Sequence, residues 1–242
     1  MENSLYVGLS SQVVLEGNMN IIANNVANLN TPGFRGQNMI FQEYVEKPRG
    51  MKEDISLVND YGQYQVTDPG PIKITGNPLD VALVGPGFLG IVTPEGVQHT
   101  RAGNLAQLAD GTLVNARGMP VAGQGGGTIN IPQDAKNVYI DQKGAVSTDE
   151  GQIGQLMISE FANYQTLNPA GNGLYVTDEA PIPATGTTLI QGKLEGSNVQ
   201  AVVEMTRMID VIREYQAVQK FMQSEHDRMR TAIQRLSRQG GG

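Results

Sequence analysis

Residues 194–236 carry a seven-residue apolar repeat that limits how the whole chain can fold. The positions at successive steps of seven are all apolar: Ala201, Met208, Tyr215, Met222, Met229 and Leu236. The interleaved positions, of which three are apolar, are Met205, Ile212, Gln219, His226 and Ile233. Because neither Pro nor Gly occurs between Ser197 and Arg238, the pattern predicts one long helix with an apolar seam. At 1.5 Å per residue this helix is about 60 Å long, so its seam needs a partner helix.

A second amphipathic helix is predicted at the other end of the chain, over residues 4–29. Steps of seven give two interleaved sets: Leu5, Gln12, Met19 and Val26, with Gly8, Leu15, Ile22 and Leu29. The turn residues Thr31, Pro32 and Gly33 end this helix, and Gly33 is expected to have a positive φ. A capping box of Ser197 and Gln200 is expected to start the C-terminal helix. The two heptad helices are expected to pack against each other as a coiled coil.

The composition narrows the remaining possibilities. A net charge of −7 argues against nucleic acid and anionic membrane surfaces as partners. The absence of cysteine excludes disulfides and thiolate metal sites. Residues 1–20 show neither a basic region nor a continuous apolar stretch, so a cleaved signal peptide is not expected. Hydrophobic residues make up only 39% of the chain, and its 30 glycines and 12 prolines predict a turn-rich middle.

The sequence predicts an α+β fold in four parts. Residues 1–34 and 191–242 are expected to supply the two helices, residues 35–75 an extended connector that could hold a hairpin, and residues 76–190 a central all-β domain. The strands expected in that domain are 80–84, 89–92, 112–114, 137–140 and 155–161. Asp110 and Gly111 are expected to form a tight hairpin turn.

Candidate chemical sites are few. Residues 85–90 match the pattern G-x-G-x-x-G, and Asp110 follows at the distance of a ribose-binding acid. A dinucleotide site also needs a helix that begins at the glycines, whereas residues 91–96 indicate a strand and a turn. A nucleotide-binding enzyme is therefore an alternative to be tested with NAD or NADP. The two histidines, His99 and His226, cannot form a metal cluster unaided, and no catalytic residue, cofactor or small-molecule substrate is expected.

The first helix is unusually rich in asparagine, with six in residues 18–30. Asparagine weakens an isolated helix, so one interpretation is a frayed surface helix. The other interpretation is that the amides hydrogen-bond to neighbouring helices and fix their register. Both predict a helix that is poorly ordered when alone.

Three sequence motifs carry a resemblance to one family. Residues 23–34 resemble the N-terminal signature of the flagellar basal-body rod and hook proteins, on Asn24, Asn25, Asn28, Thr31, Pro32, Gly33 and Phe34. Residues 194–199, 204–205 and 213–217 are similar to the C-terminal region of that family. Residues 79–83, 87–89, 100–104 and 110–114 resemble its shared β-domain. The chain departs from the family at Leu89 and at residues 105–108, which points away from its distal-rod members, and its beginning, length and ending look most like the proximal-rod members.

The resemblance implies a structural role rather than an enzymatic one. It implies a subunit of the proximal rod, in the periplasm, that assembles helically and transmits motor torque for motility; a distal-rod subunit is the alternative. The implied partners are copies of the chain, related rod proteins and the flagellar type III export apparatus. Because weak terminal helices can bury their seams only on assembly, their folding is expected to be coupled to it. The expected assembly seam consists of Leu5, Leu15, Met19, Ile22, Val26, Leu29, Met205, Met208, Ile212, Tyr215, Met222, Met229, Ile233 and Leu236.

Overall fold

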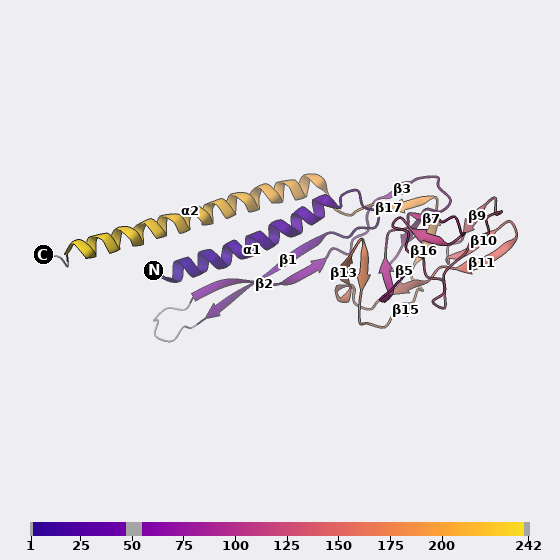
Figure 1. Cartoon of the computed structure of the whole chain (residues 1–242), viewed down its shortest axis with the longest axis horizontal. Coiled ribbons are helices and arrows are strands. Elements are labelled where there is room, and N and C mark those ends of the chain that lie inside the picture. The colour runs from indigo at the N-terminus through magenta and orange to yellow at the C-terminus, as the bar shows by residue number, and fades with distance from the viewer. Residues whose placement is uncertain (1, 47–54, 240–242) are drawn as a thin grey trace. The chain divides into compact units, whose positions relative to one another are not determined.

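The computed structural model describes residues 2–46 and 55–239, which form two compact units. The helical unit contains the helices α1 (Glu2–Ala27) and α2 (Ala201–Gln239) and the strands β1 (Gln37–Glu46) and β2 (Ile55–Gln65) up to residue 64. The β-unit contains residues 28–36 and 65–199. The fold thus has a helix near each terminus and a strand-rich region between them, which confirms the expected α+β class (Figure 1).

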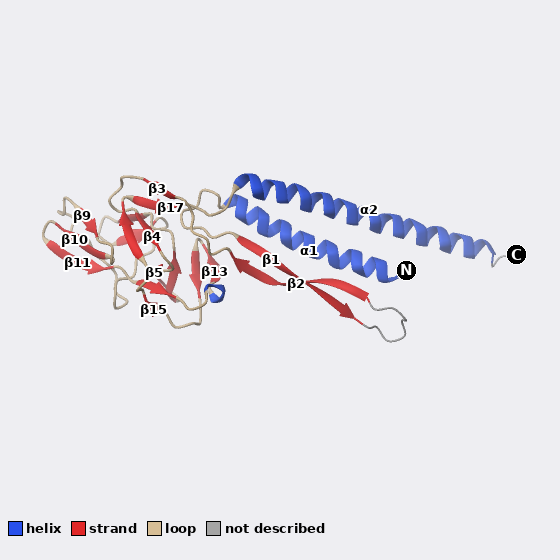
Figure 2. Ribbon diagram, turned by 180° about the vertical axis from the view of Figure 1, so that it is seen from behind, coloured by secondary structure: helices blue, strands red, loops and turns tan. Residues whose placement is uncertain are grey.

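In the helical unit, α1 and α2 run antiparallel and side by side, and α1 lies between α2 and the hairpin β1–β2 (Figures 1 and 2). Gly8 lies at the level of Met222, where a Cβ on Gly8 would be 2.9 Å from the Met222 Cγ. Val14 and Ile21 of α1 pack against Met39 of β1. The expected extended connector therefore contains a strand pair that covers part of α1.

The helix α2 begins at Ala201, later than the capping box predicted. Ser197 is buried, and its hydroxyl accepts a hydrogen bond from the Val199 amide at 3.2 Å. Gly196 donates its N–H to the Pro71 carbonyl and Asn198 to the Phe34 carbonyl, at 2.8 and 3.3 Å. The expectation of a helix start at Ser197 was wrong because these backbone groups already have partners in the β-unit.

The β-unit is built from short antiparallel strands. Its largest sheet in the described residues has the order β13 (Asn168–Gly171), β14 (Leu174–Val176), β6 (Gly96–Thr100), β5 (Phe88–Thr93), β12 (Ile158–Glu160) and β15 (Ile182–Pro183). A smaller sheet has the order β11 (Gly151–Gln155), β10 (Ala145–Thr148) and β9 (Val138–Ile140). Paired strands complete the unit: β16 (Thr188–Gln191) with β4 (Val81–Val84), β17 (Lys193–Glu195) with β3 (Ile72–Ile74), and β7 (Leu105–Gln107) with β8 (Leu113–Asn115).

Strands lie at each place where the sequence predicted one, with bounds that differ by a few residues. The expected strand 155–161 is interrupted, since β11 ends at Gln155 and β12 begins at Ile158. Gly111 has φ +91°, and the turn that contains it joins β7 to β8 as expected. The glycine-rich residues 85–90 lead from β4 into the strand β5, so the phosphate-binding helix of a dinucleotide site does not follow them.

Neither described helix contains an apolar stretch of the length that a bilayer crossing requires. Within residues 2–46 and 55–239, His, Asp and Glu side chains do not gather in groups that could hold a metal ion.

Candidate functional site: two networks of buried polar side chains

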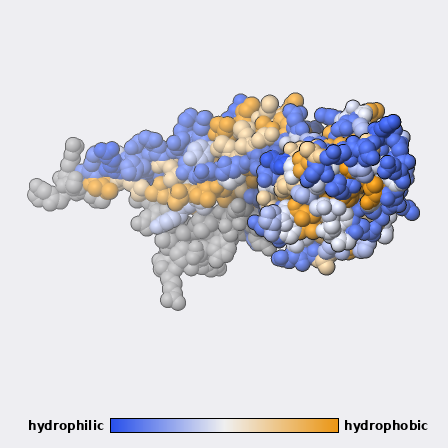
Figure 3. All heavy atoms as spheres, turned by 45° about the vertical axis from the view of Figure 1, so that its right-hand side comes forward, coloured by the Kyte–Doolittle hydropathy of each residue, from blue (hydrophilic) through white to orange (hydrophobic). Residues whose placement is uncertain are grey.

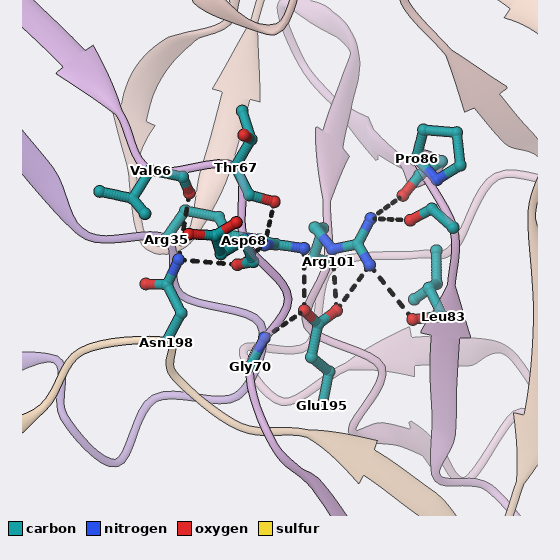
Figure 4. A network of polar contacts seen from close by, with 12 residues as sticks. Arg35, Val66, Thr67, Asp68, Gly70, Leu83, Pro86, Arg101, Glu195 and Asn198 are labelled. Atoms are coloured by element: carbon teal, nitrogen blue, oxygen red, sulfur yellow. Dashed lines mark hydrogen bonds and ion pairs between the residues drawn. The ribbon is translucent and has the colours of Figure 1, made fainter.

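The carboxylate of Glu195, which is 2% exposed, is the centre of a buried network in the β-unit (Figure 4). Its Oε1 accepts hydrogen bonds from the Gly70 amide at 3.0 Å and from Arg35 Nη2 at 2.9 Å. Its Oε2 accepts from Arg101 Nε at 2.8 Å and Nη2 at 2.7 Å. We call Glu195, Arg35 and Arg101 the Glu195 network.

Both arginines are also held by backbone carbonyls. Arg101 donates to the carbonyls of Gly85, Gly87 and Leu83 at 2.9, 2.7 and 3.1 Å, so that its guanidinium is fully hydrogen-bonded. Arg35 donates to the carbonyls of Thr67, at 2.6 Å, and Asp68. Burial, and secondly the charge of Arg101, lower the pKa of Arg35 from its ordinary value.

Asn198 joins the same segments with its amide side chain (Figure 4). Its Nδ2 donates to the carbonyls of Val66 and Asp68 at 3.1 and 2.9 Å, and its Oδ1 accepts from the Gly36 amide at 2.8 Å. Residues 33–36, 66–70 and 195–198 are therefore fixed to one another although they are far apart in the sequence. These groups are hydrogen-bonded to protein, so the arrangement holds the backbone rather than a substrate.

The turn after α1 contains most of the expected signature residues. The Thr31 hydroxyl donates to Asn28 Oδ1 at 3.0 Å, and the Thr31 amide donates to the Asn28 carbonyl at 3.1 Å. Gly33 has φ +66°, as the sequence predicted, and its N–H donates to the Glu195 carbonyl at 2.9 Å. A Cβ at Gly33 would fall on the carbonyl group of Arg101, so both the backbone angle and the available space require glycine.

A second network, in the helical unit, is centred on the signature residue Asn25, which is 2% exposed. Its Nδ2 donates to the Gln37 carbonyl at 2.8 Å, and its Oδ1 accepts from the Gln37 amide at 3.0 Å. The same Nδ2 donates to Glu204 of α2 at 3.1 Å, and Glu204 pairs with Arg207 at 2.9 Å. Arg207 in turn donates to Asn38 of β1 at 3.1 Å. Asn25 thus fixes α1 to both β1 and α2 within one chain.

The expected seam residues lie on two different faces of α2. The first set is half-buried towards α1: Ala201, Met208, Tyr215, Met222 and Met229. The positions that share this face are Glu204, Val211, Val218, Glu225 and Ala232, one residue before the expected interleaved set. Met205, Ile212 and Ile233 are exposed, at 53%, 37% and 66%, so they do not face α1 within the chain, and their place in the assembly seam stays a prediction. The side chain of Leu236 lies outside the described residues.

On α1, the expected residues face inward to different degrees. Ile22 is buried, and Leu5, Leu15, Met19 and Val26 are half-buried. Leu29, also half-buried, follows the end of α1 and belongs to the β-unit. Asn24 is exposed, whereas Pro32 and Phe34 of the signature turn are half-buried.

Sequence reasoning assigned no role to Glu195, Arg35, Arg101 or Asn198. Three of them lie in the motifs that carry the family resemblance, but their partners are 94 or more residues away in most of the bonds. A charged residue inside a strand, such as Glu195 in β17, was the available signal. Its burial with two arginines could not be read from local spacing.

Comparison with known proteins identifies the class to which this arrangement belongs. Three family models match the chain in order: "Flagella basal body rod protein" at residues 5–35, "Flagellar hook protein FlgE/F/G D1 domain" at 82–148, and "Flagellar basal body rod FlgEFG protein C-terminal" at 190–235. The chain therefore belongs to the family of flagellar basal-body rod and hook proteins, and it is a structural protein of the rod.

Relatives similar over nearly their full length carry rod-protein names. The chain is 35% identical to the flagellar basal-body rod protein FlgF of Caulobacter vibrioides, over 98% of the chain and 99% of the relative. It is 32% identical to FlgF of Rhizobium meliloti, over 98% of each. It is also 33% identical to the rod protein FlgG of Bacillus subtilis, over 92% of the chain and 94% of the relative.

Proposed function

We propose that the chain is a subunit of the proximal part of the flagellar rod, which assembles helically in the periplasm and transmits motor torque. The observation that carries this proposal is the similarity to FlgF proteins along both whole chains. The coarser conclusion, a structural rod protein, holds for the distal rod as well, and the similarity to FlgG keeps that alternative open.

The two terminal helices form a two-stranded antiparallel coiled coil in this proposal. The support is the spacing of the α2 residues directed at α1, which alternates between three and four: Ala201, Glu204, Met208, Val211, Tyr215, Val218 and Met222. A coiled coil that also packs against neighbouring subunits would resist bending and twisting, as a torque-bearing element must. Assembly is with copies of the chain and with related rod proteins.

Delivery to the rod is by the flagellar type III export apparatus. The support is family membership together with the weak, asparagine-rich α1, because a chain that is exported unfolded must not have very stable ends. Heterologous contacts between subunits that do not close into a ring would produce the rod.

The experiment is to delete the gene and complement the strain with an epitope-tagged copy. We expect non-motile deleted cells, restored motility with the tagged chain, and the tag in isolated basal bodies on the inner-membrane side of the outer-envelope rings. A tag located within those rings would assign the chain to the distal rod. Motile deleted cells, or basal bodies without the tag, would overturn the proposal.

A further inference from the structure

The last two strands of the β-unit lie against strands from its beginning. β16 pairs antiparallel with β4, and Leu189 is opposite Leu83. β17 pairs antiparallel with β3, and Leu194 is opposite Lys73. We call residues 188–195, which contain β16 and β17, the closing segment.

The closing segment supplies the partner strands for the beginning of the β-unit. Within the described residues, β3 and β4 each belong to a two-stranded sheet whose other strand lies in the closing segment. The Gly192 amide donates to the Asp80 carbonyl at 2.8 Å, and the Gly192 carbonyl accepts from the Thr75 and Gly76 amides at 2.9 and 3.1 Å. Without the closing segment, β3 and β4 would lose their partner strands, and short strands are not stable alone.

The closing segment also contributes side chains to the interior of the β-unit. Leu189 is 1% exposed and belongs to the core cluster that contains Val81, Leu83 and Ile140. At the other end of the segment, Glu195 is the centre of the Glu195 network. The face of the β-unit in Figure 3 is mainly hydrophilic with scattered apolar spots, as expected of a unit whose apolar side chains lie inside. Removing the closing segment would open this interior to water and leave two arginines without their carboxylate.

The closing segment connects the beginning of the β-unit to its smaller sheet. The Gln191 side chain donates to the carbonyls of Pro78 and of Val138 in β9, both at 2.7 Å. These partners precede Gln191 by 113 and 53 residues in the sequence. The Leu189 amide donates to the carbonyl of Gln142, which follows β9, at 3.0 Å. Such contacts form slowly, because a long loop must close before they can be made.

We propose that folding of the whole β-unit depends on the closing segment, so that the unit stays open until residues 188–195 have docked. Because a chain is synthesised from its N-terminus, the earlier strands exist before the segment that completes their sheets and core. Closure of the long loop then delays folding further. An open β-unit is the state that export of an unfolded chain requires. This consequence rests on the proposed function, whereas the dependence of folding on the closing segment does not.

The first test is a disulfide that holds the closing segment against β4 in the full chain. Val84 and Thr188 are exposed and directly opposite each other, and the chain has no cysteine of its own. The Cα atoms of opposite residues in an antiparallel pair are about 4.5–5.5 Å apart, which a disulfide can bridge. The variant Val84→Cys/Thr188→Cys is unfolded in denaturant, either oxidised or reduced, and then diluted. Pulsed hydrogen exchange with mass spectrometry measures how fast the amides of residues 88–161 become protected.

We expect the oxidised variant to protect residues 88–161 about tenfold faster or more than the reduced variant, because its long loop is already closed. The matched control is Val92→Cys/Val97→Cys, which joins opposite residues of the β5–β6 hairpin and closes only a short loop. Its oxidised and reduced forms should refold at nearly the same rate. Equal rates for the two forms of Val84→Cys/Thr188→Cys would overturn the proposal, because residues 88–161 would then fold before the closing segment docks.

The second test uses the wild-type chain and needs no substitution. In the same pulsed exchange experiment, the amides of residues 188–195 and those of residues 88–161 should become protected together. Protection of residues 88–161 before the closing segment would overturn the proposal. Neither measurement involves the rod, so such a result would leave the rod assignment intact. Absence of the tagged chain from basal bodies would instead overturn the proposed function and leave the folding dependence unchanged.

Discussion

The β-unit and the helical unit bury their apolar side chains to different degrees. In the β-unit, Leu89, Ile91, Leu113, Val121 and Val146 are completely buried in one cluster. In the helical unit, the described apolar core consists of residues that are 4–8% exposed: Val14, Ile21, Ile22, Met39 and Val211. Several large apolar side chains of that unit stay exposed, among them Tyr6, Leu9 and Ile209.

This difference indicates how each unit is stabilised. The β-unit has a closed core and a buried ion network, so its stability is expected to be internal. The helical unit relies on a narrow seam and on polar contacts such as that of Asn25, and assembly would supply further burial. Substitutions in the β-unit should therefore act on its stability, and substitutions of exposed apolar residues in the helical unit should act on assembly.

The largest loss of stability is expected from a substitution in the Glu195 network of the β-unit. Glu195→Ala leaves two buried guanidinium groups without their carboxylate, which should reduce the free energy of unfolding by about 3–5 kcal/mol. Denaturant unfolding of the purified chain measures this change. The exposed carboxylate of Glu214, replaced by alanine, is the control and should change stability by less than about 0.5 kcal/mol. A loss of less than about 1 kcal/mol for Glu195→Ala would show that the network contributes little.

The next largest loss of stability is expected on α2, where it should differ between the face turned to α1 and the exposed face. Val211 is 6% exposed and faces α1, whereas Ile212 is 37% exposed. Val211→Asp buries an unpaired carboxylate and should destabilise the helical unit by about 3 kcal/mol, whereas Ile212→Asp should cost less than about 1 kcal/mol. Thermal unfolding followed by helical circular dichroism measures both. Equal losses of stability would contradict the orientation of α2. Cells with Ile212→Asp should nevertheless be non-motile, because Ile212 belongs to the expected assembly seam.

The orientation of α2 also shows what sequence reasoning could and could not predict. Both helices, strands at the five expected places and the positive φ of Gly33 could be predicted because they depend on local spacing. The positions of α2 that face α1 include Glu204 and Glu225 and lie one residue before the predicted interleaved set, and local spacing does not separate the two sets because each has three apolar residues in five. Asn25 and Arg207 satisfy Glu204, and Arg228 pairs with Glu225. Such partners depend on tertiary structure, as does the Glu195 network.

A smaller effect is expected from His99 of the β-unit, which is 6% exposed and packs edge-on against Phe161. Within the described residues its Nδ1 has no hydrogen-bond partner, and burial lowers its pKa below the ordinary value of 6.5. The unfolded chain therefore binds a proton more readily than the folded chain. The contribution of neutral His99 to the free energy of unfolding should be fully present above about pH 6.5 and should be lost as the pH decreases towards the lowered pKa. Denaturant unfolding of His99→Gln at several pH values should show a weaker acid dependence than that of the wild type.

The smallest effect is expected at Gly8, and it contrasts with that at Gly33. A Cβ at Gly8 would approach the Met222 side chain, whose Cγ would be 2.9 Å away and whose flexible chain can move. Alanine is a better helix former than glycine by about 1 kcal/mol, which offsets the cost of that movement. Gly8→Ala should therefore change the free energy of unfolding by no more than about 1 kcal/mol in either direction. Gly33→Ala should cost more, because a positive φ and the rigid Arg101 carbonyl group oppose it. Denaturant unfolding of both variants compares them, and a larger loss at Gly8 would show that the helices cannot adjust their spacing.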